Sequence, residues 1–149
     1  MRLLVVGAGS TGGYFGGRLA QAGRDVTFLV RAARADQLKA KGLHIVSPHG
    51  DVTLAPKLVT RDAIDAPYDA ILLTVKAYSL DGALKDIAPA VGPNSMIVPM
   101  LNGMRHLESI AAAFGRDALV GGLCRIAAAL DEQGGIVHLS HFHDLAYGE

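Results

Sequence analysis

The residues with the clearest chemical potential stand at the start of the chain, where a glycine-rich motif follows the apolar run Leu3–Val6. Gly7, Gly9 and Gly12 form the pattern G-x-G-x-x-G. In such a motif the first glycine permits a tight turn after a strand, the second lets the backbone approach a pyrophosphate, and the third lets the next helix pack closely on the sheet. The start of that helix then presents free N–H groups and its positive dipole end to the anion. The motif predicts a dinucleotide site rather than a merely structural turn, and its phosphate-binding residues are Gly7, Ala8, Gly9, Ser10, Thr11 and Gly12.

The residue after the second predicted strand bears on which dinucleotide is bound. NAD-binding domains commonly place an acid about 20 residues beyond the glycines, where it binds the ribose 2′-hydroxyl. This chain has Arg31 there, with Arg34 close behind. A guanidinium can bind a 2′-phosphate through two parallel hydrogen bonds, whereas an acid would repel it. The alternative is that both are ordinary surface charges at a helix start, where cations are not favoured. The pattern therefore favours NADP(H) as the cofactor.

Two further polar residues follow buried strands. Lys76 comes after Ile71–Val75, and Asn102 with Gly103 comes after Met96–Met100. Ligands of open α/β folds bind at the carboxyl edge of the sheet, so both side chains are placed to contact a ribose hydroxyl or a substrate carbonyl. Each also has a plain explanation, namely a solvated strand end for Lys76 and an ordinary turn for Asn102-Gly103.

Strand-like apolar runs alternate with helical periodicity along most of the chain, which predicts an α/β fold with parallel strand pairing. The predicted strands are Arg2–Val6, Asp25–Val30, Leu43–Ser47, Val52–Leu54, Asp69–Val75, Ser95–Met100, Leu119–Leu130 and Gly135–Tyr147. The predicted helices are Thr11–Ala22, Arg34–Lys41, one through Leu80, Leu84, Ile87 and Val91, and one from Met104 to Phe114. The fold class is a Rossmann-type, doubly wound, mostly parallel sheet with an antiparallel C-terminal finish.

The first predicted helix contains four glycines, each of which costs up to about 1 kcal/mol relative to alanine. Gly12, Gly16 and Ala20 recur every four residues and share one face. Such a smooth face predicts unusually close packing against the sheet and the cofactor.

Length and composition narrow the class of protein. The chain has 149 residues, half of them hydrophobic, which suits one domain. Its formal net charge is zero, so neither a nucleic acid nor an anionic membrane is indicated as a partner. The lone Cys124 excludes an internal disulfide and suits a reducing compartment. The first strand begins at the N-terminus and no apolar run is long enough for a membrane span, so we expect a cytoplasmic protein without a signal peptide.

Histidines near the C-terminus raise the question of a metal site. His141 and His143 are expected to share a strand face, with His138 pointing the other way. Because no acid or cysteine completes an obvious tetrahedral set, we predict no metal and interpret these histidines as ordinary polar residues. Cys124 has no base beside it in the sequence and is interpreted as a packed thiol.

Taken together, four motifs resemble those of the ketopantoate reductases (2-dehydropantoate 2-reductases). They are Gly7–Gly12, Arg31, Thr74–Tyr78 and Leu101–Met104. The resemblance covers the chain as that family's N-terminal half. It implies NADPH-dependent reduction of 2-dehydropantoate to pantoate, in pantothenate biosynthesis. It further implies that Arg31 holds the 2′-phosphate. Lys76 and Asn102 are implied to lie near the ribose and nicotinamide, with Asn102 able to reach the substrate. Ala129 is implied to make a backbone contact with the cofactor.

The resemblance also implies a partner that this chain lacks. The family's catalytic lysine and a substrate-binding glutamate lie in a helical C-terminal domain, so residues 1–149 are expected to be an NADP-binding half that is inactive alone. Two other interpretations stay open. The chain could be the cofactor domain of another 2-oxoacid or hydroxyacid dehydrogenase, or a nucleotide-binding sensor module without catalysis.

Overall fold

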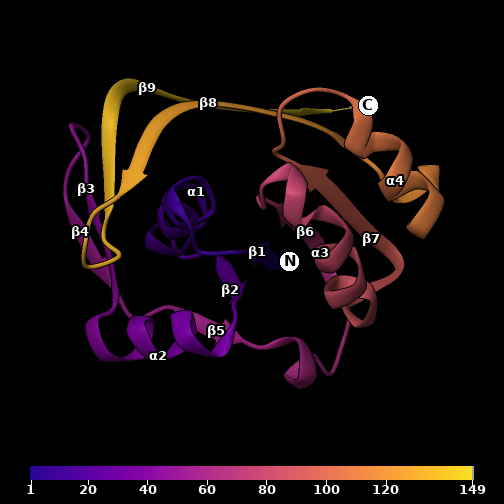
Figure 1. Ribbon diagram of the computed structural model, residues 1–149, viewed down its shortest axis with the longest axis horizontal. Coiled ribbons are helices and arrows are strands. Elements are labelled where there is room, and N and C mark those ends of the chain that lie inside the picture. Colours follow the sequence, from indigo (N-terminus) through magenta and orange to yellow (C-terminus); the bar gives the residue numbers. More distant parts are fainter. Residues whose placement is uncertain (149) are drawn as a thin grey trace.

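Two β-sheets and four α-helices make up the fold, which a computed structural model describes for residues 1–148 (Figure 1). The first sheet is entirely parallel and has the strand order β5-β2-β1-β6-β7. Its strands are β1 (Arg2–Val6), β2 (Asp25–Leu29), β5 (Lys57–Val59), β6 (Tyr68–Leu73) and β7 (Val91–Pro99). The predicted α/β class is confirmed by this sheet.

The second sheet is mixed and has the order β4-β3-β9-β8. Its strands are β3 (Leu43–Val46), β4 (Val52–Leu54), β8 (Gly121–Leu130) and β9 (Ile136–Gly148). β8 and β9 pair antiparallel, as predicted for the C-terminal finish, whereas β3 and β9 pair parallel. The finish therefore belongs to a separate sheet, which the sequence pattern did not distinguish from the first.

The helices cover both faces of the parallel sheet. They are α1 (Ser10–Gln21), α2 (Ala32–Lys41), α3 (Leu80–Ile87) and α4 (Arg105–Phe114). In Figure 1, α1 lies between the first sheet and the arch formed by β3, β4, β8 and β9, and α3 lies on the opposite side of the first sheet. Two buried apolar clusters result, one around α1 and one beneath α3 and α4.

The position of α1 between two sheets explains its four glycines. A Cβ on Gly16 would lie 2.6 Å from an atom of the Phe28 ring in the first sheet. A Cβ on Gly17, on the other side, would lie 2.7 Å from Cδ1 of Ile45 in the second sheet. Gly12 likewise faces Thr74, just after β6 of the first sheet, and Gly13 faces Ile136 of β9 in the second. The close packing predicted for one face of this helix therefore exists on two.

Two local predictions were wrong. The strand Lys57–Val59 was missed, because three residues are too short to show a period and only pairing with β2 makes them a strand. Val91 begins β7 instead of continuing a helix, since Pro89 lies in the 3₁₀ turn that follows α3. A proline lacks the N–H that an α-helix needs and its ring clashes with the preceding turn, so α3 ends at Ile87.

No helix in the described range, residues 1–148, combines the length and apolar character needed to cross a membrane.

Candidate dinucleotide-binding site

The turn between β1 and α1 is held by contacts with neighbouring strands. Gly7 has φ 95°, a left-handed conformation that glycine adopts without strain, and its N–H donates to the Leu29 carbonyl of β2 at 2.9 Å. The Thr74 hydroxyl, just after β6, donates to the Val6 carbonyl at 2.7 Å. A Cβ on Gly12 would lie 2.3 Å from Thr74 Oγ1 and 2.7 Å from the Gly7 carbonyl oxygen. The first glycine of the motif is thus required by its backbone conformation and the third by the packing around it.

Gly9 differs from these two, because nothing in the described chain lies within 4 Å of the position its Cβ would take. Its φ of −77° is open to any residue. Gly9 caps the N-terminus of α1, where no side chain caps the helix and the first turn holds no acid. The backbone N–H groups and the positive end of the helix dipole are therefore open to an anion that needs the space above Gly9.

A cleft of about 850 Å³ runs along the carboxyl ends of β1, β2, β5 and β6. Its wall includes Gly7, Ala8 and Arg31 from the predicted site, together with Thr60 after β5 and Gly82 of α3. The cleft lies where open parallel sheets bind their ligands and is of the size typical of cofactor pockets. Thr60 was not predicted, because it follows a strand that the sequence pattern did not reveal.

Three arginines line this cleft, and two of them are engaged by the protein. Arg34 is half-buried and donates from Nη2 to the Ala8 carbonyl at 2.7 Å, and burial lowers its pKa. Arg61 pairs with Asp86 at 3.4 Å and with Asp62 at 3.7 Å. Arg31 is exposed, and its guanidinium has no hydrogen bond or ion pair with any residue in the described range. Arg31 is thus the cleft arginine available to a ligand, while Arg34 positions the glycine-rich loop.

Lys76 and Asn102 follow neighbouring parallel strands of the first sheet. Leu73 pairs with Pro99, and the Met100 N–H donates to the Leu73 carbonyl at 2.9 Å, so the two chains leave the sheet at the same edge. Both Lys76 and Asn102 are exposed and neither lines the 850 Å³ cleft. Nearby Tyr78 and Met104 are 90% and 73% exposed, so this edge carries unusually open apolar surface beside its polar groups.

Ala129 lies elsewhere. It belongs to β8, pairs with Val137 of β9 and is exposed in the second sheet. It does not line the cleft, and its assignment to the cofactor stays a prediction.

The orientation predicted for the histidines was wrong. β8 and β9 shift register between Ile126 and Ala128, so that Ile126 pairs with His143 and Ala128 with His138. This irregularity places the rings of His138 and His143 together, with centroids 5.5 Å apart, and His49 from the β3–β4 turn joins them instead of the His141 ring. The alternation of side chains between the two faces of a strand is interrupted at a bulge. The approach of His49 from a distant turn cannot be predicted from the sequence around His138 and His143.

Cys124 is half-buried in β8, with its Sγ 3.9 Å from the Met100 carbonyl oxygen. Burial raises the pKa of its thiol, which suppresses the reactive thiolate. These contacts fit the interpretation of Cys124 as a packed side chain.

Comparison with known proteins identifies the family. The family described as "Ketopantoate reductase PanE/ApbA" matches residues 3–149. The chain belongs to this family. It is 47% identical over all 149 residues to an uncharacterized oxidoreductase, YkpB, of Bacillus subtilis, covering 49% of that protein. It is 36% identical over 106 residues to a 2-dehydropantoate 2-reductase of Mesorhizobium japonicum, where the match spans 70% of this chain and 32% of the relative.

Solved structures agree with this assignment. The chain superposes on the 2-dehydropantoate 2-reductase of Geobacter metallireducens with a TM-score of 0.90 and 29% identity, covering all of this chain and 49% of that one. D-mandelate dehydrogenase with NADH and anilino(oxo)acetate gives a TM-score of 0.84 and 26% identity over 94% of this chain and 46% of that one. The chain thus spans about half the length of such ketopantoate reductase relatives, and this family is one of nicotinamide dinucleotide-dependent reductases.

Proposed function

We propose that this ketopantoate reductase chain is the NADP(H)-binding part of a 2-dehydropantoate 2-reductase, which reduces 2-dehydropantoate to pantoate. The observation that carries the cofactor choice is Arg31, an exposed cation on the cleft wall with no partner among residues 1–148. The acids on the same wall, Asp62 and Asp86, are both within ion-pair distance of Arg61 and so offer little repulsion to a phosphate beside Arg31.

Each part of the site has a proposed role. The loop from Gly7 to Gly12 binds the pyrophosphate through backbone N–H groups, in the space left open above Gly9. Arg31 binds the 2′-phosphate through charge-assisted hydrogen bonds. Lys76 and Asn102, at the edge where β6 and β7 end, orient the nicotinamide ribose and polarise the substrate's 2-oxo group. The cofactor supplies the hydride, and the remaining wall of the substrate cleft comes from the helical domain that the family resemblance implies.

A titration of the protein with NADPH and with NADH tests the cofactor choice. One or two charge-assisted contacts are worth about 1.5–3 kcal/mol, or roughly tenfold to a hundredfold in affinity. We expect calorimetry to show that preference for NADPH, and Arg31→Ala to remove it. Arg24→Ala is the matched control, because Arg24 is also exposed but does not line the cleft. Equal affinities in the parent protein, or an unchanged preference in Arg31→Ala, contradict the assignment.

Gly9→Ala separates the phosphate loop from the 2′-phosphate contact in the same assay. Its methyl group meets no protein atom within 4 Å, so the fold should tolerate it. The methyl would enter the space proposed for the pyrophosphate, and affinity for both cofactors should fall without a change in their ratio. Unchanged binding with an unchanged circular dichroism spectrum would mean that the phosphate site is misplaced.

A second candidate is a hydroxyacid dehydrogenase that uses NADH, favoured by the similarity to D-mandelate dehydrogenase in its NADH complexes. Cofactor absorbance followed with the full-length protein and a panel of 2-oxo acids distinguishes the two. Fast oxidation of NADPH with 2-dehydropantoate supports the reductase, whereas turnover of an aryl 2-oxo acid with NADH supports the dehydrogenase. Binding of cofactor without turnover of any acid would instead support a sensor module.

A further inference from the structure

Three histidines gather where the turn after β3 meets the irregular part of β9. His49 lies in the turn, and His138 and His143 lie in β9. One ring nitrogen from each can be chosen so that the three nitrogens all lie within 4.8 Å of one another. None of the three lines the dinucleotide cleft, and the proposed reaction assigns them no role.

We propose that His49, His138 and His143 form a binding site for a divalent transition-metal ion of the Zn²⁺ class. Neutral imidazole is a preferred ligand of Zn²⁺, Cu²⁺ and Ni²⁺, and three imidazoles with one position left to water make a common zinc site. The proposal does not depend on the reductase function.

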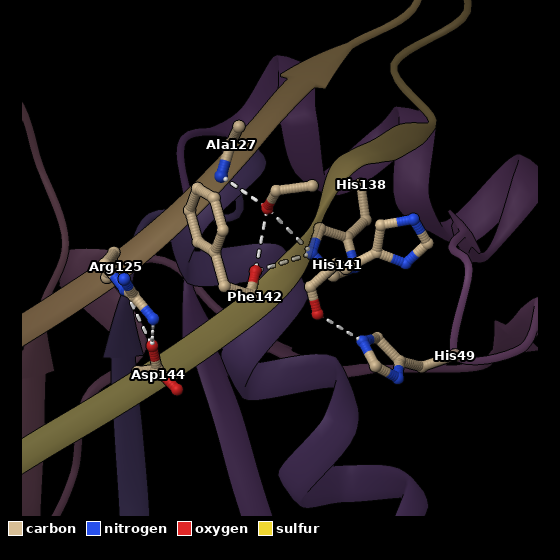
Figure 2. Close-up of polar contacts among 8 residues, drawn as sticks. His49, Arg125, Ala127, His138, His141, Phe142 and Asp144 are labelled. Atoms are coloured by element: carbon tan, nitrogen blue, oxygen red, sulfur yellow. Dashed lines mark hydrogen bonds and ion pairs between the residues drawn. The ribbon is translucent and has the colours of Figure 1, made fainter.

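His138 is the fixed member of the site, since it is only 3% exposed. Its Nε2–H faces the carbonyl oxygen of Phe142 at 3.0 Å, a group that can only accept (Figure 2). Nδ1 therefore carries the lone pair, which now accepts from the Ser47 hydroxyl at 2.8 Å. A ring N–H held by a backbone carbonyl is the usual outer support of a metal-binding histidine, because it fixes the tautomer and orients the ring.

His49 has the same arrangement at the exposed end of the cluster. Its Nε2–H donates to the His141 carbonyl oxygen at 2.6 Å, which leaves the lone pair on Nδ1 (Figure 2). His141 thus contributes its backbone, and its side chain is free of this role.

His143 is held by a side chain of α1. Its Nδ1 is hydrogen-bonded to the hydroxyl of Tyr14, a residue with no exposed surface. In the tautomer whose Nδ1–H donates to the Tyr14 oxygen, Nε2 carries the lone pair that an ion needs.

Binding requires side-chain movement, because the three rings are stacked. The planes of His49 and His143 lie 8° apart and those of His138 and His143 17° apart, so the three lone pairs do not yet converge and the rings must turn. Tetrahedral zinc with Zn–N bonds of about 2.0–2.1 Å brings its ligand nitrogens to about 3.3 Å from one another. His49 is exposed and lies beside Gly50, so its ring can turn toward the other two without disturbing the core.

The test is a calorimetric titration of the protein, freed of any histidine tag, with Zn²⁺. We expect one saturable site, and Co²⁺ bound there should show the visible absorption of a low-symmetry nitrogen site. A free Zn²⁺ concentration a hundredfold above the dissociation constant should raise the thermal midpoint by about 5–10 °C, because the ion links the turn after β3 to β9.

Three variants distinguish the site from surface binding. His49→Ala should weaken Zn²⁺ binding at least tenfold, while His141→Ala, which keeps the backbone carbonyl, should bind as the parent does. His143→Gln, which removes the second imidazole, should weaken binding comparably. The absence of saturable binding, or equal losses in His49→Ala and His141→Ala, overturns the proposal. NADPH affinity should be the same with and without Zn²⁺, so failure of this site and failure of the cofactor assignment are separate results.

Discussion

The packing of α1 between two sheets makes a quantitative prediction for Gly16→Ala. In an unhindered helix, replacing glycine by alanine stabilises by up to about 1 kcal/mol. Here the new Cβ would lie 2.6 and 2.8 Å from two Phe28 ring atoms and 3.0 Å from Val5 Cγ2, and both side chains are fully buried. Overpacking of this kind costs about 1–3 kcal/mol. Because two of these contacts are under 3.0 Å and involve a buried ring, the cost lies in the upper half of that range, at about 2–3 kcal/mol. The net loss in the free energy of unfolding is then about 1–2 kcal/mol.

Urea unfolding followed by circular dichroism measures this loss as a lower midpoint with an unchanged slope. Gly82→Ala in α3 is the control, because its Cβ would meet nothing within 4 Å and the variant should gain up to about 1 kcal/mol. Gly17→Ala should fall between them, since its Cβ would meet the ends of the Ile45 and Leu43 side chains, which can rotate more easily than a ring. A Gly16→Ala variant as stable as the parent would refute the close packing of α1 on β2.

Two further predictions concern buried polar side chains. Ser95→Ala should lower the free energy of unfolding, measured by urea titration, by about 1–3 kcal/mol. The buried Ser95 hydroxyl accepts from the Gly92 N–H at 2.8 Å and donates to the Tyr68 carbonyl at 2.6 Å, and both bonds would be lost. An unchanged urea midpoint would contradict this role. Burial lowers the pKa of His106 below its usual 6.5, so below about pH 6.5 the unfolded state binds more protons than the folded state and stability should fall as the pH falls. In His106→Gln, the free energy of unfolding measured from pH 7 to 5 should fall less steeply than in the parent protein. An identical slope would exclude His106 as a source of the pH dependence.

Local rules account for much of what could be predicted. The turn at Gly7 needs a positive φ, and the apolar runs of β1 and β6 and the periodicity of α3 depend only on neighbouring residues. The parallel sheet follows from the alternation of such strands and helices. Once that topology holds, the carboxyl ends of β1 and β2 lie at one edge, so the joint location of Gly7 and Arg31 on the cleft wall was predictable as well.

What the tertiary structure alone decided depends on contacts between distant segments. The pairing of β3 with β9 creates the second sheet. The residues of a strand do not by themselves specify which other strand it pairs with. That sheet is why α1 needs glycine on two faces, since Gly17 lies against Ile45 of β3 while Gly16 lies against Phe28 of β2. Gly12 is enclosed by Thr74, just after β6, whereas no protein atom lies within 4 Å of a Cβ on Gly9. The bulge in β9 and the turn at His49 bring three imidazoles together. Strand alternation had predicted that His138 and His143 point to opposite faces, and this failed because the bulge interrupts the period of two.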